Sequence, residues 1–123
     1  MPFPGQYMAL FNASARAIKA VDAQLRVGGP ATAQLQHVAD FAAAAEAGGI
    51  PYDFVSTHMY PTDPQCAQTI DKGWSPDCFS DHVKAARALL PANTPFYMTE
   101  YNVGCCLGYK QHDTAAAAAF IFR

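Results

Sequence analysis

Charged residues are scarce in this chain of 123 residues: they make up 15% of it, and the formal net charge is -2. The chain has no run of charges of one sign, so it lacks the basic stripe of proteins that read phosphates, and we expect no nucleic-acid partner. The longest apolar stretch, residues 115–122, is far shorter than the roughly 20 residues that cross a bilayer. We therefore expect no membrane span, while the apolar content of 51% indicates a folded domain.

Cysteine is also sparse, with four residues, and no C-x-x-C spacing predicts a zinc ribbon or a thioredoxin motif. Neither a metal-ligand spacing nor a phosphate-binding glycine motif is present, so we expect no metal and no cofactor. The cysteines allow several pairings, among which we favour Cys66–Cys78 because it closes a short loop; four reduced thiols are the alternative. A disulfide would favour a secreted or lysosome-like location for the parent protein, although the first residues lack the pattern of a signal peptide.

The pattern of apolar residues predicts helices and strands in alternation. We expect strands at residues 25–27, 52–57 and 96–99, and helices at residues 7–21, 33–47, 80–90 and from 115 onward. A Gly-Gly-Pro turn is expected to stop the first strand, and residues 62–79 read as a long loop. Such alternation predicts an α/β fold with a parallel sheet. Because a complete α/β barrel takes about 250 residues, the chain reads as a piece of one.

Three polar clusters follow the expected strands, at the edge where active sites of such barrels lie. They are Arg26 with the turn at 28–30, residues 57–60, and residues 99–102. Glu100 is the sharpest candidate, because a carboxylate that ends an apolar strand suits a nucleophile or a general acid/base. An ion pair at the strand end is its alternative role.

Further candidates lie nearby. His58 and Tyr60 could hold a sugar hydroxyl or orient Glu100, although the sequence alone favours a hydrogen-bonded core histidine for His58. His112 could line the site from its loop, and Asp113 reads as a helix cap. His37 and His82 are expected on helix surfaces. Aromatic residues of the expected loops could stack on sugar rings or pack within the loops: Tyr60, Trp74, Tyr101 and Tyr109.

Four motifs resemble those of glycoside hydrolase family 39, which holds β-xylosidases and α-L-iduronidases. Residues 25–31 (LRVGGPA) resemble the fifth-strand motif of the family, and residues 53–61 (DFVSTHMYP) resemble the sixth. Residues 99–102 (TEYN) resemble the seventh-strand motif, and His112-Asp113-Thr114 matches the start of the following helix. The four motifs occur in the order and spacing of the family, and the resemblance extends over about residues 7–122.

The resemblance implies part of a (β/α)8 TIM barrel, with the units around strands 5 to 7, that cleaves O-glycosidic bonds with retention of configuration. The chain, residues 1–123, would be a partial catalytic domain whose partners are a carbohydrate substrate and the missing remainder of the barrel. Glu100 would be the nucleophile. The sugar would be bound by His58, Tyr60, Asn102 and His112.

Two departures from the family pattern stand out. Met59 replaces the His or Ala of many members, at a position expected to point away from the sugar. More seriously, the general acid/base of the family is a Glu in an Asn-Glu-Pro motif that ends the fourth strand, and the chain has no such motif. Glu46, in an Ala-rich helix, cannot replace it. Because retaining hydrolysis needs two carboxyl groups about 5 Å apart, we expect the isolated chain to be nearly inactive.

Three alternative functions stay open at this point. An α-L-iduronidase would need Arg or Lys to bind a carboxylated sugar, and the loops offer only Lys72 and Lys110, which favours a xylosidase. The chain could also be a non-catalytic, truncated half-barrel. It could, thirdly, be a binding module that folds independently, which predicts a cooperative melt. As a fragment of a hydrolase barrel, the chain has unpaired strand edges, which predict poor solubility or self-association.

Overall fold

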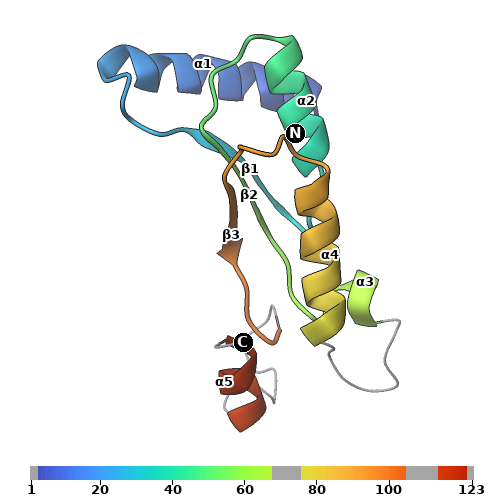
Figure 1. Cartoon of the computed structure of the whole chain (residues 1–123). Helices are drawn as coiled ribbons and strands as arrows, with labels where there is room; N and C mark the ends of the chain where they lie inside the picture. Colours follow the sequence, from blue (N-terminus) through green and yellow to red (C-terminus); the bar gives the residue numbers. More distant parts are fainter. Residues whose placement is uncertain (1–2, 68–75, 105–113, 122–123) are drawn as a thin grey trace.

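The computed structural model describes residues 3–67, 76–104 and 114–121, in which helices and strands alternate (Figure 1). The strands are β1 (Gly28–Ala33), β2 (Phe54–His58) and β3 (Phe96–Glu100). The helices are α1 (Gly5–Val21), α2 (Val38–Ala47), α3 (Pro64–Ala67), α4 (Pro76–Ala88) and α5 (Ala115–Ile121). The strands form one parallel sheet in the order β1-β2-β3, which confirms the predicted α/β class.

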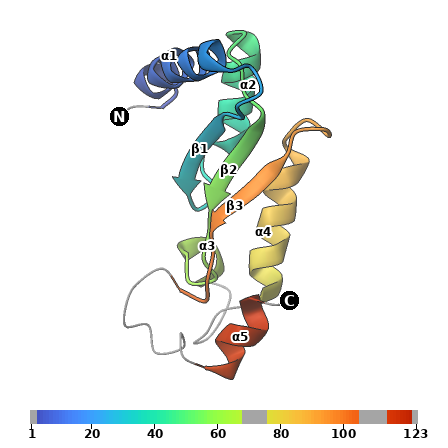
Figure 2. The same ribbon diagram turned by 90° about the vertical axis from the view of Figure 1, so that its left-hand side faces the viewer.

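All three strands point toward the same end of the molecule, where α3 and α5 lie (Figure 2). Helices α2 and α4 run along the sheet, and α1 packs against α2 near the end where the strands begin (Figures 1 and 2). This arrangement gathers the residues that follow the strands at one edge, which is where α/β barrels carry their chemistry.

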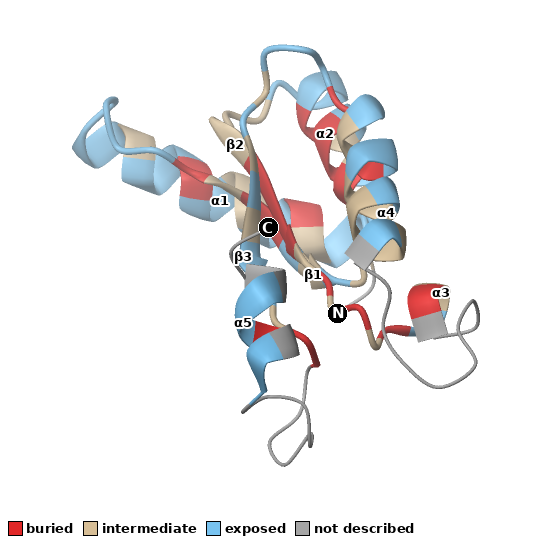
Figure 3. Ribbon diagram, turned by 60° about the horizontal axis from the view of Figure 1, so that its bottom comes forward, coloured by how far each residue is buried: buried red, intermediate tan, exposed pale blue. Residues whose placement is uncertain are grey.

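The core lies between the sheet and its helices, along β2 and the adjacent face of α2 (Figure 3). Apolar residues of α2 recur at the three- and four-residue spacing of one helix face, and they are buried: Val38, Phe41, Ala42 and Ala45. The ring of Phe41 packs edge-on against those of Phe11 and Tyr52, with 4.8 Å and 5.7 Å between the ring centroids. Burying a side chain such as Phe41 contributes about 3 kcal/mol, so this aromatic cluster fixes α1 and α2 to the sheet.

The first strand differs from its prediction. It begins at Gly28 and runs through the Gly-Gly-Pro segment, whereas the sequence predicted a strand at 25–27 and a turn after it. The two glycines serve close packing instead of a turn: a Cβ on Gly28 would lie 2.3 Å from the Phe54 carbonyl oxygen, and one on Gly29 2.7 Å from the Tyr7 hydroxyl. A register shift between Pro30 and Thr32 accommodates the irregular segment.

Two helices begin elsewhere than predicted. Helix α2 starts at Val38 instead of 33, because Gln34, Leu35 and His37 have positive φ angles of 59° to 60°, outside the right-handed helical region. Helix α4 starts at Pro76 instead of 80, within the predicted long loop, and proline is well suited to a first helical turn since it needs no N–H partner there. The single turn α3 lies in the same loop.

The predicted bounds of α1, β2, β3 and α5 agree with the structure within about two residues, the usual uncertainty of helix and strand ends. Both β1 and β3 are edge strands of the described sheet. Within the described segments, no helix combines the length and the hydrophobicity that crossing a bilayer requires.

Candidate active site

The carboxyl ends of the three strands lie side by side, beyond a register shift in each of the two pairings. Ala33 of β1 pairs with His58 of β2, and His58 pairs with Glu100 of β3. Threonine side chains tie the strands together at this level. The Thr57 hydroxyl donates to the Thr32 carbonyl at 2.6 Å, and the Thr99 hydroxyl donates to the Thr57 carbonyl at 2.9 Å. His58 and Glu100 therefore emerge side by side from a fixed edge.

The most informative contact of this edge joins Tyr60 to Glu100. The Tyr60 hydroxyl donates a hydrogen bond of 2.7 Å to Oε2 of Glu100, across 40 residues of sequence. Hydrogen bonds to a carboxylate are stronger than those between neutral groups, so this one fixes the orientation of the carboxylate. The sequence suggested that Tyr60 could orient Glu100, and the structure brings these two candidates together.

Asp63 holds Tyr60 in place and was not among the predicted site residues. Its side chain is 8% exposed, and its Oδ2 accepts a hydrogen bond of 2.8 Å from the Tyr60 N–H. The Asp63 N–H in turn donates to the Tyr60 carbonyl at 2.9 Å. An aspartate three residues after Tyr60, with Pro61 between them, is the signal in the sequence, because Asp side chains commonly bond backbone groups in turns.

The remaining predicted site residues differ in what the structure shows of them. Asn102 lies half-buried just after β3, and its Oδ1 accepts a hydrogen bond of 2.8 Å from the Val103 N–H. His58 is half-buried beside Glu100, and Tyr101 is exposed. Several other candidates lie outside the described residues: Lys72, Trp74, Cys105, Cys106, Tyr109, Lys110, His112 and Asp113.

Arg26 was expected at this edge and lies at the opposite one. Because β1 begins after Arg26, this residue precedes the strand. Its Nη1 donates to the Tyr97 hydroxyl at 3.1 Å, and its guanidinium lies 5.7 Å from the centres of the Phe54 and Tyr97 rings. Both rings belong to the first two residues of their strands. Arg26 therefore stabilises the amino end of the sheet and takes no part in the site.

Glu46 also lies at the amino end of the sheet. Its Oε1 accepts a hydrogen bond of 3.0 Å from the hydroxyl of Tyr52, which precedes β2. Nearby, the pKa of Asp53 is lowered by its hydrogen bonds to Lys19 and to the Val27 N–H. The two glutamates of the chain thus sit at opposite ends of the sheet, and Glu46 does not reach Glu100.

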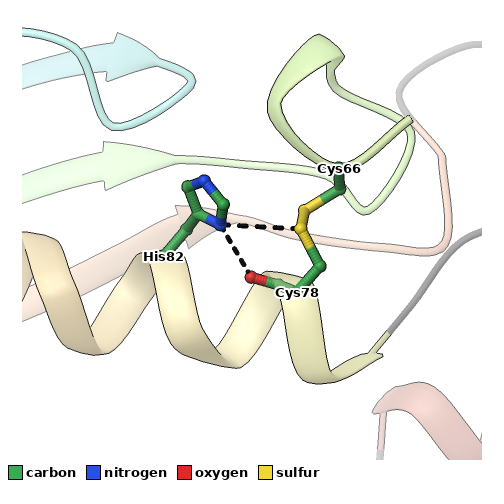
Figure 4. A group of neighbouring side chains, drawn as sticks. All are labelled: Cys66, Cys78 and His82. Atoms are coloured by element: carbon green, nitrogen blue, oxygen red, sulfur yellow. Dashed lines mark hydrogen bonds between the residues drawn. A yellow bond between two sulfur atoms is a disulfide. The ribbon is translucent and has the colours of Figure 1, made fainter. Parts of the chain in front are cut away.

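A disulfide joins the loop after β2 to the first turn of α4. It links Cys66 to Cys78, with a Cα–Cα distance of 5.7 Å, which confirms the favoured pairing (Figure 4). His82 was expected on a helix surface, but it is half-buried, with Nδ1 3.5 Å from the Cys78 sulfur and 3.0 Å from the Cys78 carbonyl oxygen. The Cys66 and Cys78 sulfurs and a ring nitrogen of His82, all atoms of a kind that can bind a metal ion, lie within 4.8 Å of one another. Metals bind thiolates, so the disulfide form leaves this cluster without its sulfur ligands.

Comparison with known proteins identifies the family. Residues 4–123 match the family described as glycosyl hydrolases family 39. The chain belongs to this family. It is 35% identical over 124 residues to a β-xylosidase of Caldicellulosiruptor saccharolyticus, a match that covers 96% of the chain and 25% of the relative. The family 39 match confirms the resemblance seen in the sequence motifs.

Solved structures of family 39 agree with this fold. A monomeric β-xylosidase from Caulobacter crescentus superposes with a TM-score of 0.78 at 35% identity, over 94% of this chain and 25% of that one. A family 39 enzyme from Xanthomonas axonopodis pv. citri gives a TM-score of 0.80 at 35% identity, over 94% of this chain and 24% of that one. The chain therefore corresponds to about a quarter of these TIM-barrel enzymes.

Proposed function

We propose that this chain carries the nucleophile of a retaining, β-xylosidase-like glycoside hydrolase, and that Glu100 is that nucleophile. The observation that carries the proposal is the Tyr60 hydrogen bond to Oε2 of Glu100 at the carboxyl edge of the sheet. Membership of family 39 supports the hydrolase class, and the β-xylosidase relatives support the substrate class.

In this mechanism Tyr60 fixes one carboxylate oxygen and leaves Oε1 to attack the anomeric carbon. A bond forms between Oε1 and the sugar while the bond to the leaving oxygen breaks, and water later hydrolyses the glycosyl-enzyme. His58, beside Glu100 in the register, binds the sugar together with Asn102 and His112. Asn102 Oδ1 already accepts a hydrogen bond from the Val103 N–H. We therefore assign the other polar group of this side chain, the Nδ2 nitrogen, to a sugar hydroxyl.

The general acid/base comes, in this proposal, from a part of the barrel outside this chain. Glu46 lies at the wrong end of the sheet, and a carboxyl group about 5 Å from Glu100 is required to protonate the leaving oxygen. Residues 1–123 are then a partial catalytic domain, with the units around strands 5 to 7. We expect the isolated chain to be nearly inactive toward aryl xylosides.

The test is covalent labelling of Glu100 in the protein as translated from its gene, with whatever residues precede Met1 or follow Arg123. The probe is an aryl xyloside with a good leaving group and with fluorine beside the anomeric carbon, which slows release of the glycosyl-enzyme. We expect peptide mass spectrometry to find the sugar on Glu100. Glu100→Gln should abolish the label, and Glu46→Gln should leave it unchanged.

Three outcomes would each contradict all or part of the proposal. A label on another carboxylate would assign the nucleophile elsewhere. Absence of both hydrolysis and label in the folded wild-type protein would favour the non-catalytic half-barrel. Labelling by a fluorinated iduronide but not by the xyloside would keep Glu100 as nucleophile and move the substrate to the carboxylated sugar.

A further inference from the structure

A short series of contacts connects the Cys66–Cys78 disulfide to the candidate nucleophile Glu100. Glu100 accepts its hydrogen bond from Tyr60, and the Tyr60 N–H is held by Asp63. The Asp63 carbonyl accepts a hydrogen bond of 2.9 Å from the Cys66 N–H, and Cys66 is bonded to Cys78. Three hydrogen bonds and one disulfide thus connect Glu100 to α4.

The two cysteines lie in elements of different length. Cys78 sits in the first turn of α4, a helix of 13 residues whose Ala86 is buried in the main core. His82 packs on the Cys78 side of the disulfide (Figure 4). Cys66 sits in α3, which is a single turn of four residues. Helix α4 is therefore the anchor, and the segment between Tyr60 and Cys66 is the part that the disulfide positions.

We propose that the Cys66–Cys78 disulfide is a redox-responsive strap that positions Tyr60 on Glu100, so that a dithiol reductant lowers the turnover of the enzyme. In the reduction, the two sulfurs of the reductant form their own disulfide, and their two electrons and two protons convert Cys66 and Cys78 to thiols. The turn at residues 60–63 then loses its covalent tie to α4. This inference rests on the proposed role of Glu100.

The kinetic test uses the protein as translated, assayed on an aryl β-xyloside before and after incubation with dithiothreitol. A chelator is present, because the two cysteine sulfurs and a His82 ring nitrogen lie within 4.8 Å of one another in the disulfide form, and the thiols released by reduction would bind a soft divalent cation. We expect kcat to fall roughly 10-fold with little change in KM, since loss of the orientation of a catalytic group slows the chemical step. The Cys66→Ser/Cys78→Ser variant should show the lowered kcat from the start and no response to the reductant.

A strap that acts through Tyr60 also predicts non-additivity. In Tyr60→Phe the hydrogen bond to Glu100 is already absent, so reduction should change kcat little further. An equal fold-loss in Tyr60→Phe and in the wild type would overturn the proposal, as would full kcat in the double serine variant. A response to reductant that persists in the double serine variant would assign the effect to other thiols and overturn it too.

Amide hydrogen exchange tests the strap without any substrate. The N–H groups of Tyr60, Asp63 and Cys66 are hydrogen-bonded within the turn, so reduction should accelerate their exchange, while the amides of β2 should exchange as before. Unchanged exchange in peptides covering residues 59–67 would refute the strap even in a protein that hydrolyses xylosides. Accelerated exchange in a protein that neither hydrolyses nor labels would instead leave the strap in place and refute the role of Glu100.

Discussion

Tyr60 and Glu100 form a hydrogen-bonded pair at the carboxyl edge of the sheet, with 2.7 Å between the hydroxyl and Oε2. The same pair of residue types recurs at the amino edge, where the Tyr52 hydroxyl donates to Glu46 at 3.0 Å. Of these two pairs, only the first joins the carboxyl ends of two neighbouring strands, and only it lies at the edge where barrel enzymes bind their substrates. Substitutions in the Tyr60–Glu100 pair therefore test the proposed function, and the same substitutions in the Tyr52–Glu46 pair are the matched control.

Tyr60→Phe should lower kcat by about 10- to 100-fold in the protein as translated, because it removes a hydrogen bond to a charged group worth about 1.5–3 kcal/mol. The matched variant Tyr52→Phe removes the corresponding hydroxyl from Glu46 and should leave kcat within about 2-fold of the wild type. Steady-state kinetics on an aryl β-xyloside measure both. Equal losses in the two variants would show that the tyrosines act through stability alone.

The sequence was sufficient to predict the alternation of helices and strands, the parallel sheet and the place of Glu100. These predictions rest on periodicity and on short apolar runs such as residues 96–98, which local chemistry determines. The hydrogen bond between Tyr60 and Glu100 depends on the register of β2 against β3, and no local pattern encodes that register. The role of Asp63 was missed for a similar reason, since a buried turn aspartate and an exposed one have the same local sequence.

The segment at 28–30 shows where pattern rules mislead. Gly-Gly-Pro is a strong turn signal, yet Gly28 lies within a strand because Phe54 of the neighbouring strand approaches it closely. Tertiary packing of this kind is invisible in one sequence. The predicted strand was therefore too close to the N-terminus. As a result, Arg26 was predicted at the carboxyl end of the sheet, whereas it lies at the amino end.

Gly28→Ala should destabilise the protein by about 3 kcal/mol, because a Cβ there would lie 2.3 Å from the Phe54 carbonyl oxygen and the two strands would have to separate. Gly5→Ala is the matched control, since a Cβ at Gly5 meets nothing within 4 Å. Denaturant unfolding of the protein as translated measures both variants. A Gly28→Ala protein as stable as the Gly5→Ala protein would contradict the close packing of β1 on β2.

The isolated chain, residues 1–123, should self-associate. Strands β1 and β3 are both edges of the described sheet, and β3 leaves Tyr97 42% exposed. Unpaired strand edges with apolar neighbours pair with other chains. Sedimentation velocity at increasing concentration should show species larger than the monomer, whereas the protein as translated should show less association. A monomeric isolated chain with a cooperative melt would indicate that these residues form an independent domain.

Asp53 should make the free energy of unfolding depend on pH in the acid range. Its Oδ2 lies 2.8 Å from Lys19 Nζ and accepts a hydrogen bond of 2.7 Å from the Val27 N–H, and these contacts, the lysine first, lower its pKa from the ordinary 3.8. A carboxyl group with a lowered folded-state pKa contributes stability above its unfolded pKa, and this contribution is lost as the pH falls through the folded value. Asp53→Asn should therefore destabilise the protein by about 1–2 kcal/mol near neutral pH.

The difference between the wild type and Asp53→Asn should shrink as the pH falls below 3.8 and vanish once the pH lies below the lowered folded-state pKa of Asp53. Thermal melts between neutral pH and strong acid measure it. Asp40→Asn is the control, because the side chain of Asp40 is 68% exposed and an exposed pair with His37 contributes little. A pH-independent difference for Asp53→Asn would show that the loss is one of packing, since only the charged carboxylate titrates over that range.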